Sequence, residues 1–147
     1  MWLAQRPHVT PSMARAWYTH VCAPALARKS RVFSGFVSQK AAENPESVLR
    51  LEHHRRIQAT LTSLVARHLG EGKNDAAEFI EVLLKCENVH IVTFRENYDV
   101  HKAAGNYEDA SVSLIDWADL PITTQATLYR RVLRGRVANA NAFKPAV

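Results

Sequence analysis

The stretch that most constrains the fold is Cys86–Lys102, which reads CENVHIVTFRENYDVHK. From Val89 to Phe94 successive residues alternate as in a short, mostly buried β-strand. Thr93 and Glu96 then have the spacing of a capping box, in which each residue caps the other at the start of a helix. The stretch therefore predicts a strand that runs directly into a helix over about residues 94–104.

Polar side chains of this helix and of an upstream segment could form one site. Asn97 and His101 are four residues apart, so both leave the same face of the predicted helix. Upstream, Glu52, His53 and His54 end a predicted strand that begins near Ser47. Adjacent residues of a strand point to opposite faces, so one histidine can face a metal while the other faces a substrate.

This combination resembles the HNH family of nucleases, whose ββα-metal core has a histidine on its first strand, an asparagine at the hairpin and metal ligands on the helix. Members show a segment of the form N-(L/V)-x-x-(L/M)-T-x-x-E-H-x-x-(L/V)-H. Asn88 matches the central asparagine, Asn97 replaces the first helix histidine as in HNN variants, and His101 matches the second. The resemblance covers about Leu49 to Ala104. Two features depart from the family: the gap between His54 and Asn88 is long, and paired Cys-x-x-Cys motifs are absent.

The resemblance implies a role for each matched residue. His54 would be the general base, and Asn88 would orient its ring. A divalent metal, usually Mg²⁺ with Mn²⁺ or another transition metal as alternatives, would be held by His53, Asn97 and His101. A frame shifted by one residue stays open, in which Glu52 is the ligand and His53 the base.

The composition permits a phosphate-bearing partner without proving one. The 147 residues fit one domain, with a net charge of +5 and a pI near 9.5. Arg55 and Arg56, directly after the histidines, are the better candidates for holding phosphate. Arginines of the last predicted helix could add salt-dependent contacts, namely Arg130, Arg131 and Arg134.

The cellular location is predicted from two further features. Cys22 and Cys86 lack metal-type spacing, which favours reduced thiols in an intracellular protein. No apolar run approaches the roughly 18 residues of a membrane helix. We therefore expect a protein of the cytoplasm, or of the host cytoplasm if phage-encoded, with no membrane partner.

The chain is expected to be a single α+β domain that is mostly helical, with a ββα-metal core embedded in additional helices. An N-terminal helical arm covers residues 1–46, and within it residues 32–37 are either a strand or an ordered loop. The core covers 47–104 and contains a helical insertion at 57–85, where apolar residues recur at helical spacing. A helical extension, with a short strand near 111–115 and a helix over about 121–138, covers 105–147.

These features predict a metal-dependent DNA endonuclease of HNH type that nicks one strand per active site; RNA remains open as a substrate. Two alternatives are an inactive nucleic-acid-binding protein of the same fold and a helical interaction or assembly protein without a metal site. Small stand-alone members of the family resemble those of phages and mobile elements. A homodimer or a protein partner from such an element is therefore also considered.

Overall fold

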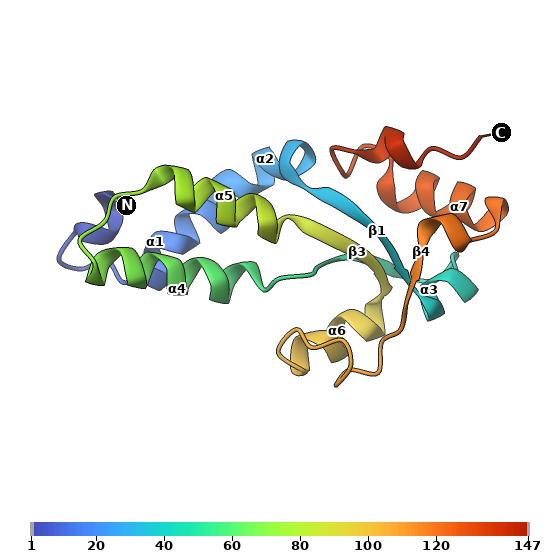
Figure 1. The fold of residues 1–147 in the computed structure, drawn as a ribbon, viewed down its shortest axis with the longest axis horizontal. Helices are drawn as coiled ribbons and strands as arrows, with labels where there is room; N and C mark the ends of the chain where they lie inside the picture. The colour runs from blue at the N-terminus through green and yellow to red at the C-terminus, as the bar shows by residue number, and fades with distance from the viewer. Residues whose placement is uncertain (1, 147) are drawn as a thin grey trace.

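The computed structural model describes residues 2–146, so that Met1 and Val147, at the ends of the predicted domain, lie outside the described residues. The fold is α+β and mostly helical, as predicted. A four-stranded sheet lies at the centre, and a layer of long helices extends from one end of it (Figure 1). Helices α6 and α7 lie on opposite sides of the sheet.

The strands are β1 (Val32–Ser38), β2 (Leu49–His53), β3 (Asn88–Thr93) and β4 (Leu114–Asp116). The α-helices are α1 (Pro11–Trp17), α2 (Ala23–Ser30), α3 (Gln39–Glu43), α4 (Ile57–Gly70), α5 (Ala76–Cys86), α6 (Phe94–Lys102) and α7 (Ile122–Leu128). Shorter helical turns are η1 (Trp2–Gln5), η2 (Tyr18–Cys22), η3 (Trp117–Asp119), η4 (Tyr129–Leu133) and η5 (Ala140–Phe143), of which η2 and η4 are π-helical.

The sheet has the strand order β2-β3-β1-β4. Strand β3 pairs antiparallel with β2 and parallel with β1, whereas β4 pairs antiparallel with β1. The face that carries Phe33, Val89 and Ile91 packs against η4 and η5 and forms the main apolar core. The other face carries His90 and lies toward α6. Below, the face of the main apolar core is called the α7 face, and the face that carries His90 is called the α6 face.

The predicted passage from strand to helix is confirmed. Thr93 caps α6 by accepting a hydrogen bond from the Glu96 backbone N–H at 3.2 Å, and Glu96 accepts one from the Thr93 N–H at 2.9 Å. Glu96 is buried and also accepts a hydrogen bond from Ser38 of β1 at 2.6 Å. One carboxylate therefore both starts α6 and fixes it to the sheet.

The predicted helical insertion is also confirmed. Helices α4 and α5 join β2 to β3 and form an antiparallel pair that, with α1, makes the helical layer seen to the left of the sheet in Figure 1. Their buried residues include Leu61, Leu64 and Leu83, which form a second apolar cluster. Asp75 caps α5, accepting a hydrogen bond from the Glu78 N–H at 2.9 Å.

The N-terminal arm and the C-terminal extension differ from the prediction. Residues 32–37, for which strand and loop were both open, form most of the central strand β1, so the arm is not purely helical. The register between β1 and β3 shifts between Phe33 and Val37, where Gly35 has a φ of +90°. The last helix, predicted to reach about Ala138, ends at Leu133 in a π-helical turn because Gly135 follows with a φ of +70°.

Candidate active site

The adjacent histidines at the end of β2 point to opposite faces, as the strand alternation predicted. His53 pairs with Val89 of β3, whose side chain belongs to the core of the α7 face. His54 continues the ladder by donating its backbone N–H to the Asn88 carbonyl at 3.0 Å, and its ring turns to His90 on the α6 face. The two imidazole rings therefore lie in different environments, on opposite faces of the sheet.

His53 belongs to a buried junction between the sheet and the helical layer. Its Nε2 lies 3.5 Å from the Glu87 carboxylate, which is 1% exposed. The same carboxylate accepts a hydrogen bond from the Tyr18 hydroxyl at 3.3 Å and lies 3.7 Å from Nε of Arg31. Burial alone would raise the pKa of Glu87, but His53, Arg31 and Tyr18 together hold it below its ordinary value. The nearest carboxylate to Nε2 of His53 is thus the buried Glu87, on the side of the sheet away from His90.

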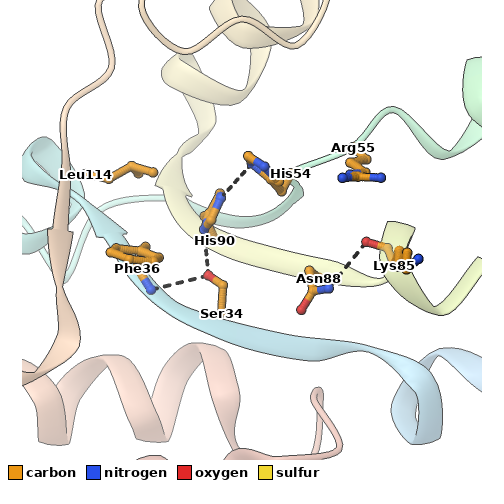
Figure 2. A pocket seen from close by; sticks show the side chains of 8 residues that line it. All are labelled: Ser34, Phe36, His54, Arg55, Lys85, Asn88, His90 and Leu114. Atoms are coloured by element: carbon orange, nitrogen blue, oxygen red, sulfur yellow. Dashed lines mark hydrogen bonds between the residues drawn. The ribbon is translucent and has the colours of Figure 1, made fainter. Parts of the chain in front are cut away.

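His54 belongs to a hydrogen-bonded chain of three side chains, drawn in Figure 2. Its Nδ1 lies 3.1 Å from Nε2 of His90, and Nδ1 of His90 lies 2.6 Å from Oγ of Ser34. Ser34 Oγ also lies 2.9 Å from the Val89 carbonyl and 3.3 Å from the Phe36 backbone N. The chain runs from β1 through β3 to the residue that follows β2.

The partners of Ser34 assign the protons along this chain. A carbonyl can only accept, so the hydroxyl donates to Val89, and the two lone pairs of Oγ accept from the Phe36 N–H and from Nδ1–H of His90. Nε2 of His90 is then bare and accepts from Nδ1–H of His54. This assignment, inferred from the network, satisfies every contact at once and leaves Nε2 of His54 unprotonated.

His90 is the buried centre of the chain, with 4% of its surface exposed. Burial, reinforced by the charge of His54, lowers the pKa of His90 from 6.5 to about 4. The rings of Phe36 and Tyr107 pack edge-on against it at centroid distances of 5.9 and 5.4 Å. His90 therefore stays neutral near pH 7 and acts as a fixed hydrogen-bond acceptor for His54.

A cavity of about 510 Å³ opens beside this chain. Arg55, Lys85 and Asn88 border it together with both histidines (Figure 2). Lys85 pairs with Glu81 at 2.5 Å, whereas Arg55 has no carboxylate partner among residues 2–146. The Asn88 amide donates to the Lys85 carbonyl at 3.3 Å, so Asn88 supports His54 through its backbone and not through the predicted contact with the ring. An imidazole base and an unpaired guanidinium thus face one cavity.

The predicted metal ligands lie elsewhere. His53 and His101 border a second pocket of about 200 Å³ together with Glu52, and Asn97 is not among its lining residues. Burial raises the pKa of Glu52, although His53 and Arg56 oppose that shift. In the described part of the chain, no three His, Cys, Asp or Glu side chains converge as metal ligands. His53, Asn97 and His101 as they lie do not line one pocket, because Asn97 does not border the pocket that His53 and His101 share.

The predicted phosphate-binding arginines separate into two groups. Arg55 borders the cavity and Arg56 borders the pocket with Glu52. The arginines of the last helix lie on the α7 side, and one of them, Arg131, pairs with Glu46 at 3.1 Å. The last helix therefore does not face the cavity of His54.

Sequence reasoning did not place Ser34, Lys85, His90 or Tyr107 among the candidate site residues. His90 did carry a usable indication, since a polar residue inside a buried strand needs a hydrogen-bond partner. Nothing local pointed to Ser34, which is 56 residues away in the chain.

None of the family models, curated proteins and solved structures compared with the chain matches it. In the described residues no helix has the length and apolar character to cross a membrane.

Proposed function

We propose that this chain is a nuclease that hydrolyses phosphodiester bonds of nucleic acid, with His54 as the general base. The observation that carries this proposal is the chain of contacts Ser34–His90–His54, which engages Nδ1 of His54 and leaves Nε2 as its free ring nitrogen, at the cavity that Arg55 also borders. A base at the correct tautomer and a cation for the phosphate are the two groups that such a hydrolysis needs.

The order of elements supports the HNH type. Antiparallel strands β2 and β3 are followed directly by α6, which is the sequence of elements in a ββα unit. Asn88, His54 and Arg55, matched or chosen on the resemblance, border the same cavity. The inserted α4 and α5 explain the long gap between His54 and Asn88.

The chemistry assigned to the residues is a water attack. Nε2 of His54 takes a proton from water, the resulting hydroxide attacks phosphorus, and the bond to the 3′ oxygen breaks, with that oxygen taking a proton from solvent. The imidazolium formed on His54 keeps its Nδ1–H bond to Nε2 of His90. Because its pKa is about 4, His90 stabilises this cation without taking its proton. Arg55 offsets charge on the phosphate oxygens.

The metal requirement remains a prediction of the resemblance, and no step above uses a metal. Mg²⁺ or Mn²⁺ would have to be held by a ligand set other than His53, Asn97 and His101 as they lie. Glu52, His53 and His101 border one pocket, and Glu52 is the ligand of the alternative frame left open by the sequence, in which His53 would be the base. Cleavage in EDTA compared with Mg²⁺ and Mn²⁺ decides this point separately from the role of His54.

The test is nicking of supercoiled plasmid, together with cleavage of labelled single-stranded DNA and RNA, by the unaltered chain and two variants. His54→Ala should reduce the rate by about 100-fold or more, the usual contribution of a general base. His20→Ala, which removes an exposed histidine of the helical layer, is the matched control and should cut normally. Equal rates for His54→Ala and the unaltered chain contradict the proposal, and so does absence of cleavage under every metal condition.

A second candidate function is assembly through the helical layer. Met13, Trp17 and Val21 are four residues apart along α1 and η2, and each is more than half exposed. The simplest occupant of this stripe is the same stripe of a second copy, since a twofold interface buries one patch on both subunits. Light scattering on the unaltered chain and on Trp17→Glu tests it: a dimer that the substitution dissociates supports assembly, and a monomer in both cases contradicts it.

A further inference from the structure

The outward face of α6 carries two exposed aromatic rings one turn apart. Phe94 and Tyr98 are 55% and 47% exposed. They stand four residues apart and so leave the same face of the helix. The residues of α6 that are buried are Glu96 and Val100, on its inner side. The two rings are therefore not part of the packing that holds α6 to the sheet.

Each ring is accompanied by cations. The guanidinium carbon of Arg50 lies 5.2 Å from the Phe94 centroid, and Nζ of Lys102 lies 4.7 Å from the Tyr98 centroid. Arg95 lies 5.7 Å from the Tyr98 ring and pairs with Asp99 at 3.2 Å. Arg50 and Lys102 have no carboxylate partner among residues 2–146. Three cations stand against one carboxylate, so the surface favours an anionic partner.

We propose that this surface, the α6 platform of Arg50, Phe94, Arg95, Tyr98 and Lys102, binds single-stranded nucleic acid. In the free chain the cations lie over the exposed rings. On binding, the cations move to the phosphates of the strand, and the rings become stacking surfaces for its bases. The bases of a duplex are stacked on one another and cannot use the rings, so a single strand is the occupant. An acidic protein segment would use the cations alone and would leave both rings without a matching group.

The platform leads toward the proposed catalytic base. Arg50, Glu52 and His54 follow one another at every second residue on the α6 side of β2, so Arg50 and His54 are about 13 Å apart along the strand. The chain that leaves α6 brings Tyr107 to within 6.3 Å of the His54 ring. This inference extends the proposed nuclease function. It depends on that function in one respect only, namely that a strand bound to the platform is the strand presented to His54.

Binding can be measured without cleavage. The experiment uses the full chain carrying His54→Ala, with fluorescence anisotropy of labelled DNA and RNA single strands of roughly 12 nucleotides and of the corresponding duplex. The single strands should bind at least 10-fold more tightly than the duplex. Adding Phe94→Ala or Tyr98→Ala should weaken single-strand binding by about 5- to 150-fold per ring, the range for loss of one stacked base.

Two control variants separate stacking from general surface effects. Tyr98→Phe keeps the ring and should bind as the parent does, and Trp17→Ala removes an aromatic ring that is 56% exposed on the helical layer and should also bind normally. Lys102→Gln should make the plot of log affinity against log salt concentration less steep by about 0.7, the value for one phosphate contact on a single strand. Comparison of the DNA and RNA probes shows which sugar the platform prefers.

Several outcomes overturn the inference. They are absence of single-strand binding at low salt, equal binding of duplex and single strand, and normal binding by the folded Phe94→Ala, Tyr98→Ala double variant. If the unaltered chain does not cut but ring-dependent binding is present, the platform stands and the proposed nuclease fails. If the chain cuts with His54 required while the double variant binds normally, the nuclease stands and the platform fails.

Discussion

Acidification should destabilise the protein through His90. In the folded chain burial holds the pKa of His90 at about 4, against 6.5 for an exposed histidine. The unfolded chain therefore binds a proton at this position more readily than the folded one, so that stability rises with pH. The stabilising contribution is complete above about pH 6.5 and is lost as the pH falls toward 4.

The size of the effect follows from the two pKa values. Complete protonation corresponds to a loss of roughly 3 kcal/mol, and lowering the pH from 7.5 to 5.5 already costs about 1.4 kcal/mol. The measurement is the free energy of unfolding in urea at pH 7.5 and 5.5. In His90→Gln the loss of stability that His90 causes between pH 7.5 and 5.5 should be absent, because glutamine does not titrate. This expectation does not depend on how much the substitution itself changes stability at pH 7.5.

One neighbouring group, Glu52, also titrates, and a control histidine variant tests for effects that are not specific to His90. Burial raises the pKa of Glu52, the residue that pairs with His90 across the strands. This shift makes stability fall as the pH rises, which is opposite to the effect of His90, and it is present in both the unaltered chain and His90→Gln. His20→Gln removes an exposed histidine and should leave the pH dependence unchanged. Ring ¹⁵N shifts should show His90 neutral at pH 5.5 with its proton on Nδ1. Equal pH dependence in His90→Gln and the unaltered chain, or a proton on Nε2, refutes the reasoning.

Three stability predictions concern the rest of the fold. Glu87→Gln should cost about 2 kcal/mol in urea unfolding at pH 7, since it removes the buried carboxylate that three half-buried side chains contact, while Glu81→Gln at an exposed pair should change less than about 0.5 kcal/mol. Thr93→Ala should cost about 1 kcal/mol by loss of the cap of α6, and unchanged unfolding would contradict the capping box. Gly105→Ala should cost about 1–2 kcal/mol in thermal unfolding, because φ is +94° and the added Cβ would lie 3.3 Å from an arginine side chain. Gly70→Ala, in open helical surroundings, should instead raise the melting temperature.

The predictions from sequence that held were those set by neighbouring residues. The capping box of Thr93 and Glu96, the apolar face of α4 and the opposite directions of His53 and His54 all follow from spacings of one to four residues. Such spacings fix local geometry whatever the rest of the chain does.

The features that sequence reasoning could not supply depend on distant pairing. The segment that forms β1 contains Gly35 at a positive φ and a register shift, so its alternation was not readable as a strand. Without β1 there was no way to place Ser34 beside His90, although the two are 2.6 Å apart. The grouping of His53, Asn97 and His101 likewise depends on how β2 and α6 meet in space, and Asn97 does not border the pocket that His53 and His101 share.

The position of the helical insertion ties the helical layer to the cavity. Arg55 precedes α4 and Lys85 lies in the last turn of α5, so both ends of the insertion border the site of His54. Glu87, one residue after α5, is in turn fixed by Tyr18 of the first helices. If Trp17→Glu changes the oligomeric state and the cleavage rate together, the two candidate functions belong to one mechanism; if it changes assembly alone, the insertion holds the cavity independently of what binds the helical layer.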